Sequence, residues 1–270
     1  MFLVQAASLF NSIQAVNLFG ITFAKYKTPE GAERMRNTQT VAALGAFRQQ
    51  TRMSHLIANN LSNAQTIGFK REIPVFQSIL SKTSERFQNI QNDTVKISFL
   101  PGPIQKTGND LDLAIEGGGF FKVKSPNGVR YTRNGNFGLN KDQVLINADG
   151  YPVLGQRGEI ILTGKKIAVG TNGSISVNGN EVDQIALVTF PDLNILKKEG
   201  HTLLKNESLQ EEIEAQQSQV VQGALEASNV NAVEEMINLM DSYRTYESCL
   251  KIIQADNSLD SKAVNEVGRV

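Results

Sequence analysis

The sequence predicts an α+β fold in which an N-terminal and a C-terminal helix pair as a coiled-coil-like unit and enclose an all-β domain. Apolar residues recur at helical spacing near both ends of the chain. Between them, short alternating runs are separated by turn dipeptides, as in antiparallel sheets. Hydrophobic residues make up 40% of the 270 residues, which is enough for a sizeable core.

The C-terminal helix has a clear start signal at Asn231, a good N-cap residue, with Glu234 placed to complete a capping box. One apolar stripe follows at steps of three and four residues: Val233, Met236, Ile237, Met240, Tyr243, Leu250 and Ile253. Further apolar residues, Leu239, Tyr246 and Ile252, fall outside this stripe. A helix that is apolar on more than one side needs more than one neighbour. Two interpretations stay open: a core helix of one domain, or a polymer-forming helix.

The N-terminal helix is predicted from about Thr38 to Asn63. Its apolar positions are Val41, Leu44, Phe47, Met53, Leu56, Ile57 and Leu61, with small residues between them that allow another helix to approach closely. We expect the helix to end within residues 59–68, where Asn63 and Gly68 suit an irregular exit. Asn59, Asn60 and Asn63 serve either as local caps or as hydrogen-bonding groups across a helix interface.

The first 34 residues predict neither a transmembrane helix nor a secretory signal. Polar residues such as Gln5 and Asn11 interrupt the apolar run, and no basic residue precedes Lys25. Met35 begins a stretch that looks like a natural start. We therefore expect residues 1–34 to be an upstream extension.

The middle of the chain, residues 109–205, predicts a compact antiparallel β domain. Its turn dipeptides are Asn127-Gly128, Asn134-Gly135, Asp149-Gly150, Asn172-Gly173 and Asn178-Gly179, a pattern typical of β-hairpins. Strands are predicted over 111–115, 120–124, 128–133, 143–146, 160–162, 166–169, 174–177 and 184–190. The complete division is an extension (1–34), an N-terminal helix (35–69), an extended connector (70–108), the β domain (109–205), a flexible polar return (206–228) and a C-terminal helix (229–270).

Composition and motifs exclude several functional classes. Lys plus Arg and Asp plus Glu number 27 each, so no net field favours nucleic acid or an anionic membrane. The single cysteine, Cys249, forms no internal disulfide. His55 and His201 have no metal ligands at suitable spacing and are expected at the surface or at an interface. The sequence therefore predicts no metal site and no cofactor.

The glycine run 117–119 resembles a phosphate-binding loop only superficially, since a strand follows it, and it predicts a sharp bend. A glycosidase pair is conceivable from carboxylates such as Asp112 and Glu159, but no nucleophile signature is present. We expect no enzyme and no catalytic residues.

Three blocks of sequence carry a resemblance to a known family. Residues 58–70 read ANNLSNAQTIGFK, residues 112–121 read DLAIEGGGFF and are followed by YTRNG at 131–135, and residues 228–236 read SNVNAVEEM and are followed by RTYE at 244–247. Together, in this order, they resemble the signatures of bacterial flagellar basal-body rod and hook proteins. The lead-in LPGPIQKTG at 100–108 and GYPVLG at 150–155 are most similar to the FlgF-type proximal-rod group, with the FlgG-type distal-rod group second.

The resemblance implies a structural subunit that is exported by the flagellar type III apparatus without a cleaved signal. It implies a helical rod that transmits torque across the periplasm to the hook. The implied partners are copies of the chain, other rod proteins and the P ring. The implied assembly interface comprises Leu44, Phe47, Ile57, Asn59, Asn60, Leu61, Asn63, Val230, Val233, Met236, Ile237, Met240, Tyr243, Leu250 and Ile253. Alternatives are a distal-rod protein, a soluble β-domain enzyme that uses Asp112 or Glu159, and an adhesin.

Overall fold

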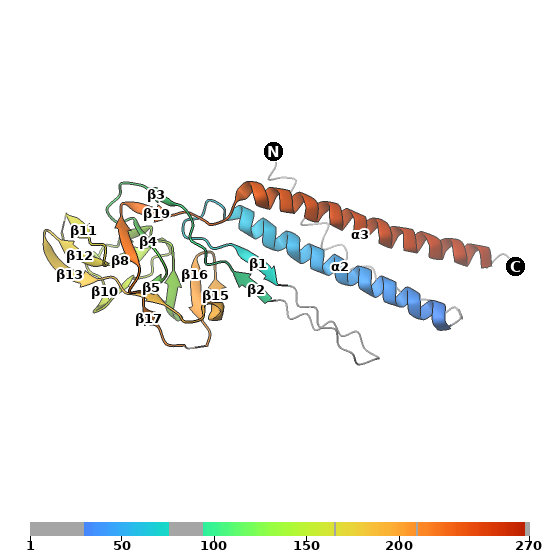
Figure 1. Ribbon diagram of the computed structural model, residues 1–270, viewed down its shortest axis with the longest axis horizontal. Helices are drawn as coiled ribbons and strands as arrows, with labels where there is room; N and C mark the ends of the chain where they lie inside the picture. The colour runs from blue at the N-terminus through green and yellow to red at the C-terminus, as the bar shows by residue number, and fades with distance from the viewer. Residues whose placement is uncertain (1–29, 76–93, 165, 209, 268–270) are drawn as a thin grey trace. The chain divides into compact units, whose positions relative to one another are not determined.

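The computed structural model describes residues 30–75, 94–164, 166–208 and 210–267 (Figure 1). The chain divides into two units between Gly45 and Ala46. Residues 30–45 are helical, and the contacts described below all belong to residues 46–270. The predicted extension, residues 1–34, falls outside the described residues except for its last five.

Two long helices contact one another and flank a β region, which confirms the predicted α+β fold. Helix α2 spans Glu30–Ser62 and helix α3 spans Ala232–Val267. Asn231 caps α3 as expected, because its Oδ1 accepts hydrogen bonds from the backbone N–H groups of Val233 and Glu234 at 3.1 and 3.3 Å. The carboxylate of Glu234 pairs with Arg71 at 3.2 Å.

The described strands are short and antiparallel. They are β1 (Glu72–Val75), β2 (Thr94–Ile97), β3 (Ile104–Lys106), β4 (Leu113–Glu116), β5 (Phe120–Ser125), β6 (Gly128–Thr132), β7 (Phe137–Leu139), β8 (Leu145–Asn147), β9 (Leu154–Gly155), β10 (Gly158–Glu159), β11 (Ile167–Val169), β12 (Ser174–Val177), β13 (Asn180–Gln184), β14 (Leu187–Thr189), β15 (Leu196–Glu199), β16 (Leu203–Asn206), β17 (Ile213–Glu214), β18 (Gln219–Gln222) and β19 (Ala224–Glu226). A 3₁₀ turn, η2, covers Leu193–Ile195.

The main sheet has six strands in the order β15-β16-β6-β5-β14-β17. A three-stranded sheet, β11-β12-β13, and several two-stranded ladders complete the β region. Two of these ladders join distant segments: β19 pairs with β3, and β18 pairs with β4. Strands adjacent to α3 in sequence are thereby tied to the beginning of the β domain.

Two clusters of buried apolar side chains form the core. The larger lies among the strands of the β domain: Leu113, Ile115, Phe121, Val123, Phe137, Leu145, Val153, Ile160, Leu162, Ile175, Val177, Ile185, Leu187, Leu203 and Val220. The smaller consists of Phe120, Tyr131, Val188, Phe190, Leu196 and Leu204. Ile97 and Phe99, from the predicted connector, pack against the smaller cluster. The described part of the connector is therefore extended and docked on the β domain.

The hairpin turns follow the predicted chemistry in most places. Asn178 and Gly179 both have positive φ, 52° and 88°, in the turn between β12 and β13, as a type I′ turn requires. The dipeptides at 127–128 and 172–173 also join paired strands. Asn134-Gly135 was predicted as a hairpin turn, and this is wrong because β6 and β7 are not paired.

The prediction that the segment before α3 is a flexible polar return is also wrong. Residues 206–221 contain β17 and most of β18, and Val220 lies in the larger core cluster. The polar composition of this segment hid two apolar residues that reach the core, Val220 and the partly buried Ala215. The predicted strand at 160–162 is absent as well, since Ile161 makes only an isolated bridge to Val144, although Ile160 and Leu162 are buried.

Gly135 has a packing role in place of the predicted turn. A Cβ atom at this position would lie 1.6 Å from the carbonyl oxygen of Leu113, whereas nothing lies within 4 Å of a Cβ at Gly138. We expect Gly135→Ala to lower the free energy of unfolding by about 3 kcal/mol or more, since backbone must move. Gly138→Ala, the matched control, should change it far less. Urea unfolding of both full-length variants tests this, and equal effects would contradict it.

Candidate assembly interface

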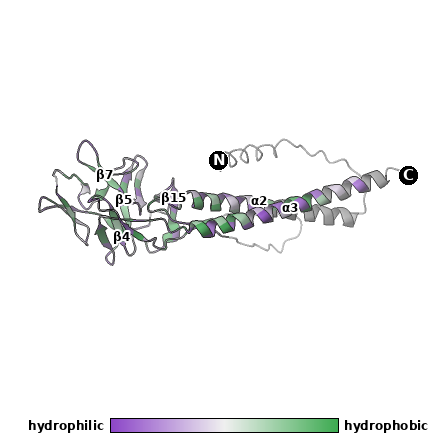
Figure 2. Cartoon of the chain, turned by 90° about the horizontal axis from the view of Figure 1, so that it is seen from above, coloured by the Kyte–Doolittle hydropathy of each residue, from purple (hydrophilic) through white to green (hydrophobic). Residues whose placement is uncertain are grey.

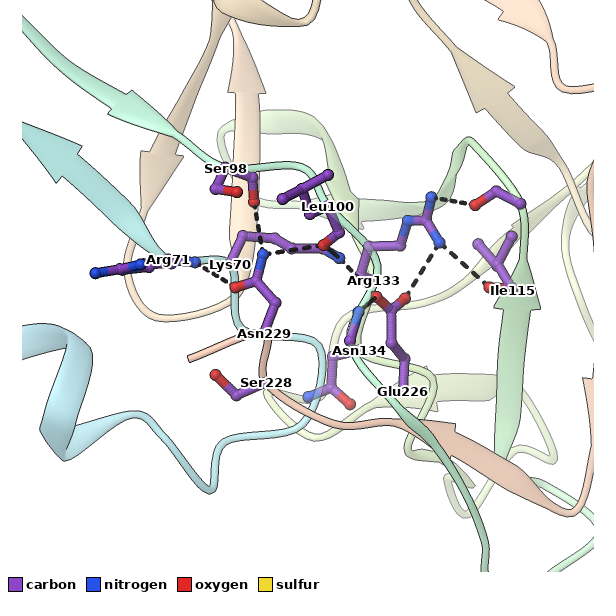
Figure 3. Close-up of polar contacts among 12 residues, drawn as sticks. Lys70, Arg71, Ser98, Leu100, Ile115, Arg133, Asn134, Glu226, Ser228 and Asn229 are labelled. Carbon is purple, nitrogen blue, oxygen red and sulfur yellow. Dashed lines mark hydrogen bonds and ion pairs between the residues drawn. The ribbon is translucent and has the colours of Figure 1, made fainter. Parts of the chain in front are cut away.

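The site begins with a buried carboxylate at the junction between the helices and the β domain. Glu226, the last residue of β19, is 1% exposed. Its Oε1 lies 2.6 Å from Lys70 Nζ, and its Oε2 lies 3.1 Å from Arg133 Nη1 (Figure 3). Lys70 and Arg133 are also buried. One anion and two cations thus share a space that excludes most water, and we call these three residues the charge triad.

Backbone groups complete the bonding of the charge triad. Lys70 Nζ donates to the carbonyl of Leu100 at 2.9 Å, and the N–H of Gly102 donates to Glu226 Oε1 at 2.9 Å. Burial lowers the pKa of Lys70, while the charge of Glu226 opposes that shift. Burial likewise lowers the pKa of Arg133 against the same opposing charge. The carboxylate therefore opposes the loss of charge that burial favours in both cations.

Asn229 provides a second tie beside the charge triad (Figure 3). Its Oδ1 accepts from the backbone N–H of Arg71 at 2.7 Å. Its Nδ2 donates to the carbonyls of Ser98 and Leu100, both at 2.9 Å. The segment after α2, the connector and the segment before α3 are joined by this one amide side chain.

Close backbone approach at the junction requires glycine. Gly68 has φ +68°, and a Cβ there would lie 2.3 Å from the backbone nitrogen of Asn134. A Cβ at Gly102 would lie 2.0 Å from the carbonyl oxygen of Ala227. The three sequence blocks at 58–70, 112–135 and 228–247 therefore meet at this junction.

The two helices contact each other through a polar layer. Gln50 Nε2 donates to the carbonyl of Ser242 at 2.8 Å and to its Oγ at 2.6 Å, and Ser54 Oγ lies 2.7 Å from Ser242 Oγ. Phe47 packs on Tyr246 with ring centroids 5.1 Å apart. These directional contacts specify which turn of α2 faces which turn of α3.

Glu235 is the one buried charged side chain in the described part of α3, and its partner, Arg71, lies in the segment after α2. Its Oε1 lies 2.6 Å from Arg71 Nε. Burial raises the pKa of Glu235, the charge of Arg71 opposes this, and Glu234 adds to the rise. Between Ala232 and Ala255, the fully buried side chains of α3 are those of Glu235 and Ser242, both polar.

The apolar stripe of α3 points to solvent. Val233, Met236, Ile237, Met240 and Tyr243 are between 50% and 66% exposed. Figure 2 shows this apolar character in the first turns of α3. Leu250 and Ile253 are half-buried, and Val230 is buried just before the helix. We call the five exposed residues the α3 stripe, and together they form an apolar surface that the described chain leaves uncovered.

The predicted residues of α2 have mixed positions. Ile57 is buried, and Phe47 and Leu61 are half-buried. The side chain of Leu44 lies outside the described residues. The buried Asn60 exchanges two 2.9 Å hydrogen bonds with the backbone of Glu72. Asn59 donates to the Glu72 carboxylate at 3.2 Å and also accepts from Asn63, so these asparagines bind the helix exit and β1 and make no described bond to α3.

Sequence reasoning missed the charge triad. Lys70 and Arg133 lie inside quoted motifs, yet neither was singled out, and Glu226 lies in the short apolar run 224–227. The one available signal was a glutamate flanked by Leu225 and Ala227, which is an unusual place for a charge.

The two candidate catalytic carboxylates, Asp112 and Glu159, serve structural roles. Asp112 is buried and accepts from Thr107 at 2.6 Å and Asn109 at 3.1 Å. Glu159 pairs with Lys124 at the surface, 2.9 Å away. His55 and His201 are exposed, as expected. Within the described ranges, no cluster of three potential metal ligands is found, and no helix is long and apolar enough to cross a membrane.

Comparisons with known proteins agree with this architecture. The "Flagellar basal body rod FlgEFG protein C-terminal" profile matches residues 221–266, and "Flagellar hook protein FlgE/F/G D1 domain" matches residues 114–177. The flagellar basal-body rod protein FlgF of Caulobacter vibrioides is 35% identical over 84% of this chain and 97% of its own length. The chain belongs to the flagellar basal-body rod FlgEFG family. FlgG of Bacillus subtilis is 30% identical over 80% of the chain and 93% of that relative.

Membership in the FlgEFG family makes this chain a structural protein of the flagellar basal-body rod and not an enzyme. FlgF of Mesorhizobium japonicum, at 28% identity over 84% of the chain and 96% of its own length, is a further relative. Assembly with other rod subunits follows from membership in this family.

Removing the central charge of the triad should be severe. We expect Glu226→Gln to lower the free energy of unfolding by about 3–5 kcal/mol, since Lys70 and Arg133 then remain buried without a counter-charge. Glu159→Gln, which breaks the exposed pair with Lys124, should cost about 1 kcal/mol or less. Urea unfolding of both full-length variants provides the comparison. A similar loss in both would argue against the charge triad as the critical tie.

The raised pKa of Glu235 predicts a pH dependence. Because its folded-state pKa lies above the ordinary value of 4.5, its contribution to stability is present below that value and is lost as the pH rises through the raised pKa. Relative to Glu235→Gln, the wild type should therefore gain free energy of unfolding as the pH falls from neutral to about 4.5. Urea unfolding at several pH values measures the difference, and a constant difference would refute the expectation.

Proposed function

We propose that this chain is a proximal-rod subunit whose terminal helices build the inner wall of a helical tube and whose β domain lies outside that wall. The observation that carries the proposal is the α3 stripe. Five large apolar side chains are at least half exposed on a helix whose buried positions between Ala232 and Ala255 are polar. Each square ångström of apolar surface removed from water contributes about 25 cal/mol, so neighbouring subunits that cover the stripe would stabilise the assembly.

The junction suits a part that carries torque. The charge triad and Asn229 tie the segment after α2 and the segment before α3 to the connector and to the residue after β6 through directional bonds of 2.6–3.1 Å. Rotation of the helices would therefore be passed to the β domain through a buried, bonded junction and not through a loose linker. This arrangement supports a drive-shaft role in which torque passes from the motor towards the hook.

The proximal position, the P ring as a neighbour and export by the flagellar type III apparatus belong to the same proposal. The support for this position is the 35% identity to FlgF of Caulobacter vibrioides; FlgG of Bacillus subtilis, at 30%, and FlgF of Mesorhizobium japonicum, at 28%, do not separate the two groups. Labelling the chain in purified basal bodies tests it. Label between the inner-membrane ring and the P ring is expected. Label confined to the segment inside the P and L rings would assign the chain to the distal rod.

A charge within the α3 stripe should abolish assembly without unfolding the β domain. We expect Ile237→Asp to eliminate motility and rod incorporation in a strain that lacks the native gene, because an unpaired buried charge is strongly unfavourable. Ile213→Asp is the matched control, since Ile213 on β17 is also 50% exposed. The control should swim normally. Normal swimming of the Ile237→Asp strain would count against the proposed interface.

A further inference from the structure

A small cavity lies beside the charge triad, where the junction meets the hairpin formed by β15 and β16. Its volume is about 10 Å³, close to that of one water-sized sphere. Three separate parts of the chain border it: the segment after α2, the residue after β6 and the β15–β16 hairpin. The lining residues are Gly68, Lys70, Arg133, Lys198, His201, Thr202 and Leu204.

The lining of the cavity is positively charged. Lys70, Arg133 and Lys198 border it, and no carboxylate of the described residues does. Within the charge triad, two cations share the single carboxylate of Glu226, so one positive charge is in excess. Lys198 does not change this balance, because its Nζ lies 3.1 Å from Glu72 Oε1 and that pair is neutral. The cavity is therefore surrounded by groups that lack one negative charge.

Two of the lining residues carry a buried nitrogen without a hydrogen-bond partner among the described residues, Arg133 Nε and Lys198 Nζ. Arg133 is 5% exposed, and its other two nitrogens donate to Glu226 and to the carbonyls of Ile115 and Gly117 (Figure 3). Lys198 Nζ lies 3.5 Å from the centre of the Phe69 ring and pairs with Glu72 by charge alone. Buried donors of this kind are normally satisfied by an ordered water or an ion.

The chemistry of the lining favours an anion over a water molecule. Lysine and arginine side chains donate hydrogen bonds and accept none. A water molecule would bring two O–H donors into this donor-rich space and would leave the excess positive charge uncompensated. A halide ion accepts N–H groups from several sides and carries one negative charge. Burial lowers the pKa of Lys70, Arg133 and Lys198, and a bound anion would oppose all three shifts.

We propose that this cavity binds one halide ion, held by the N–H groups of Arg133 and Lys198 beside the ammonium of Lys70. The ion links the β15–β16 hairpin to the segment after α2 and to the residue after β6, so it is a structural part of the junction. His201 lines the cavity and is exposed, which gives ions a route from solvent. The site belongs to the single chain and does not rest on the proposed function.

Thermal unfolding of the full-length chain in two salts tests the site. The measured quantity is the Tm in 300 mM sodium chloride minus the Tm in 300 mM sodium gluconate, whose anion is too large for the cavity. We expect this difference to be about 2–4 °C smaller in Lys198→Met than in the wild type, because the variant loses the stabilisation that a bound ion gives to the folded state. General effects of the two salts cancel in this comparison.

Lys197→Met is the matched control. Lys197 lies on the same strand, is 67% exposed and pairs with Glu207 at the surface. Its salt difference should equal that of the wild type. A chloride-dependent rise in Tm that Lys198→Met retains would place the ion elsewhere and overturn the proposal. The same salt difference in all three chains would also overturn it.

Bromide provides a direct measurement on the unaltered chain, which is independent of whether Lys198→Met folds. We expect crystals of the full-length chain soaked in sodium bromide to show an anomalous-scattering peak in the cavity, in contact with Arg133 Nε and Lys198 Nζ. Density for a water molecule and no anomalous peak would refute the site. A peak without any chloride-dependent change in Tm would indicate binding at crystal concentration only and would also refute it. None of these outcomes bears on the rod function.

Discussion

The structure depends on the carboxylate of Glu226, which is held between Lys70 and Arg133 where little water reaches any of the three. Loss of this one carboxylate would leave two buried cations uncompensated, so the arrangement is strongly specified even though buried ion pairs add little net stability. The three residues come from the segment after α2, the position that directly follows β6 and the strand that precedes α3. The relation between the terminal segments and the β domain is therefore set by electrostatics and by the hydrogen bonds of Asn229.

Helix α3 is arranged unlike the helix of a monomeric domain. Its inner side contributes Glu235 and Ser242 to ion pairs and hydrogen bonds, while its α3 stripe remains exposed. Directional polar contacts determine which turns of the two helices meet, whereas the non-directional apolar surface would provide the energy of association in the proposed assembly. This division suits a subunit that must hold its own geometry and still bind neighbours on another side.

Much of the local structure was predictable. Asn231 as a cap and Asn178-Gly179 as a turn depend on the chemistry of a few adjacent residues, and both predictions are confirmed. The α+β order, the two helices and the sharp bend at the glycine run also follow from local patterns; Gly117 and Gly119 have φ near +105°. The turn prediction at Asn134-Gly135 failed because Gly135 is required by the close approach of Leu113, which is distant in sequence. The prediction of a flexible segment at residues 206–221 failed because Val220 is buried where β18 pairs with β4. Strand β4 is likewise distant in sequence.

The sequence by itself determined the helices, most of the turns, the absence of a recognisable catalytic motif and the family, because each depends on short-range patterns that survive without coordinates. Only the tertiary structure decided which apolar residues are covered. The periodicity of Val233, Met236, Ile237 and Met240 is the same whether that side of the helix faces a core or water. Tertiary contacts also decided that Lys70, Arg133 and Glu226 meet, because a charge pairs with whatever the fold brings within a few ångströms and not with its neighbours in sequence.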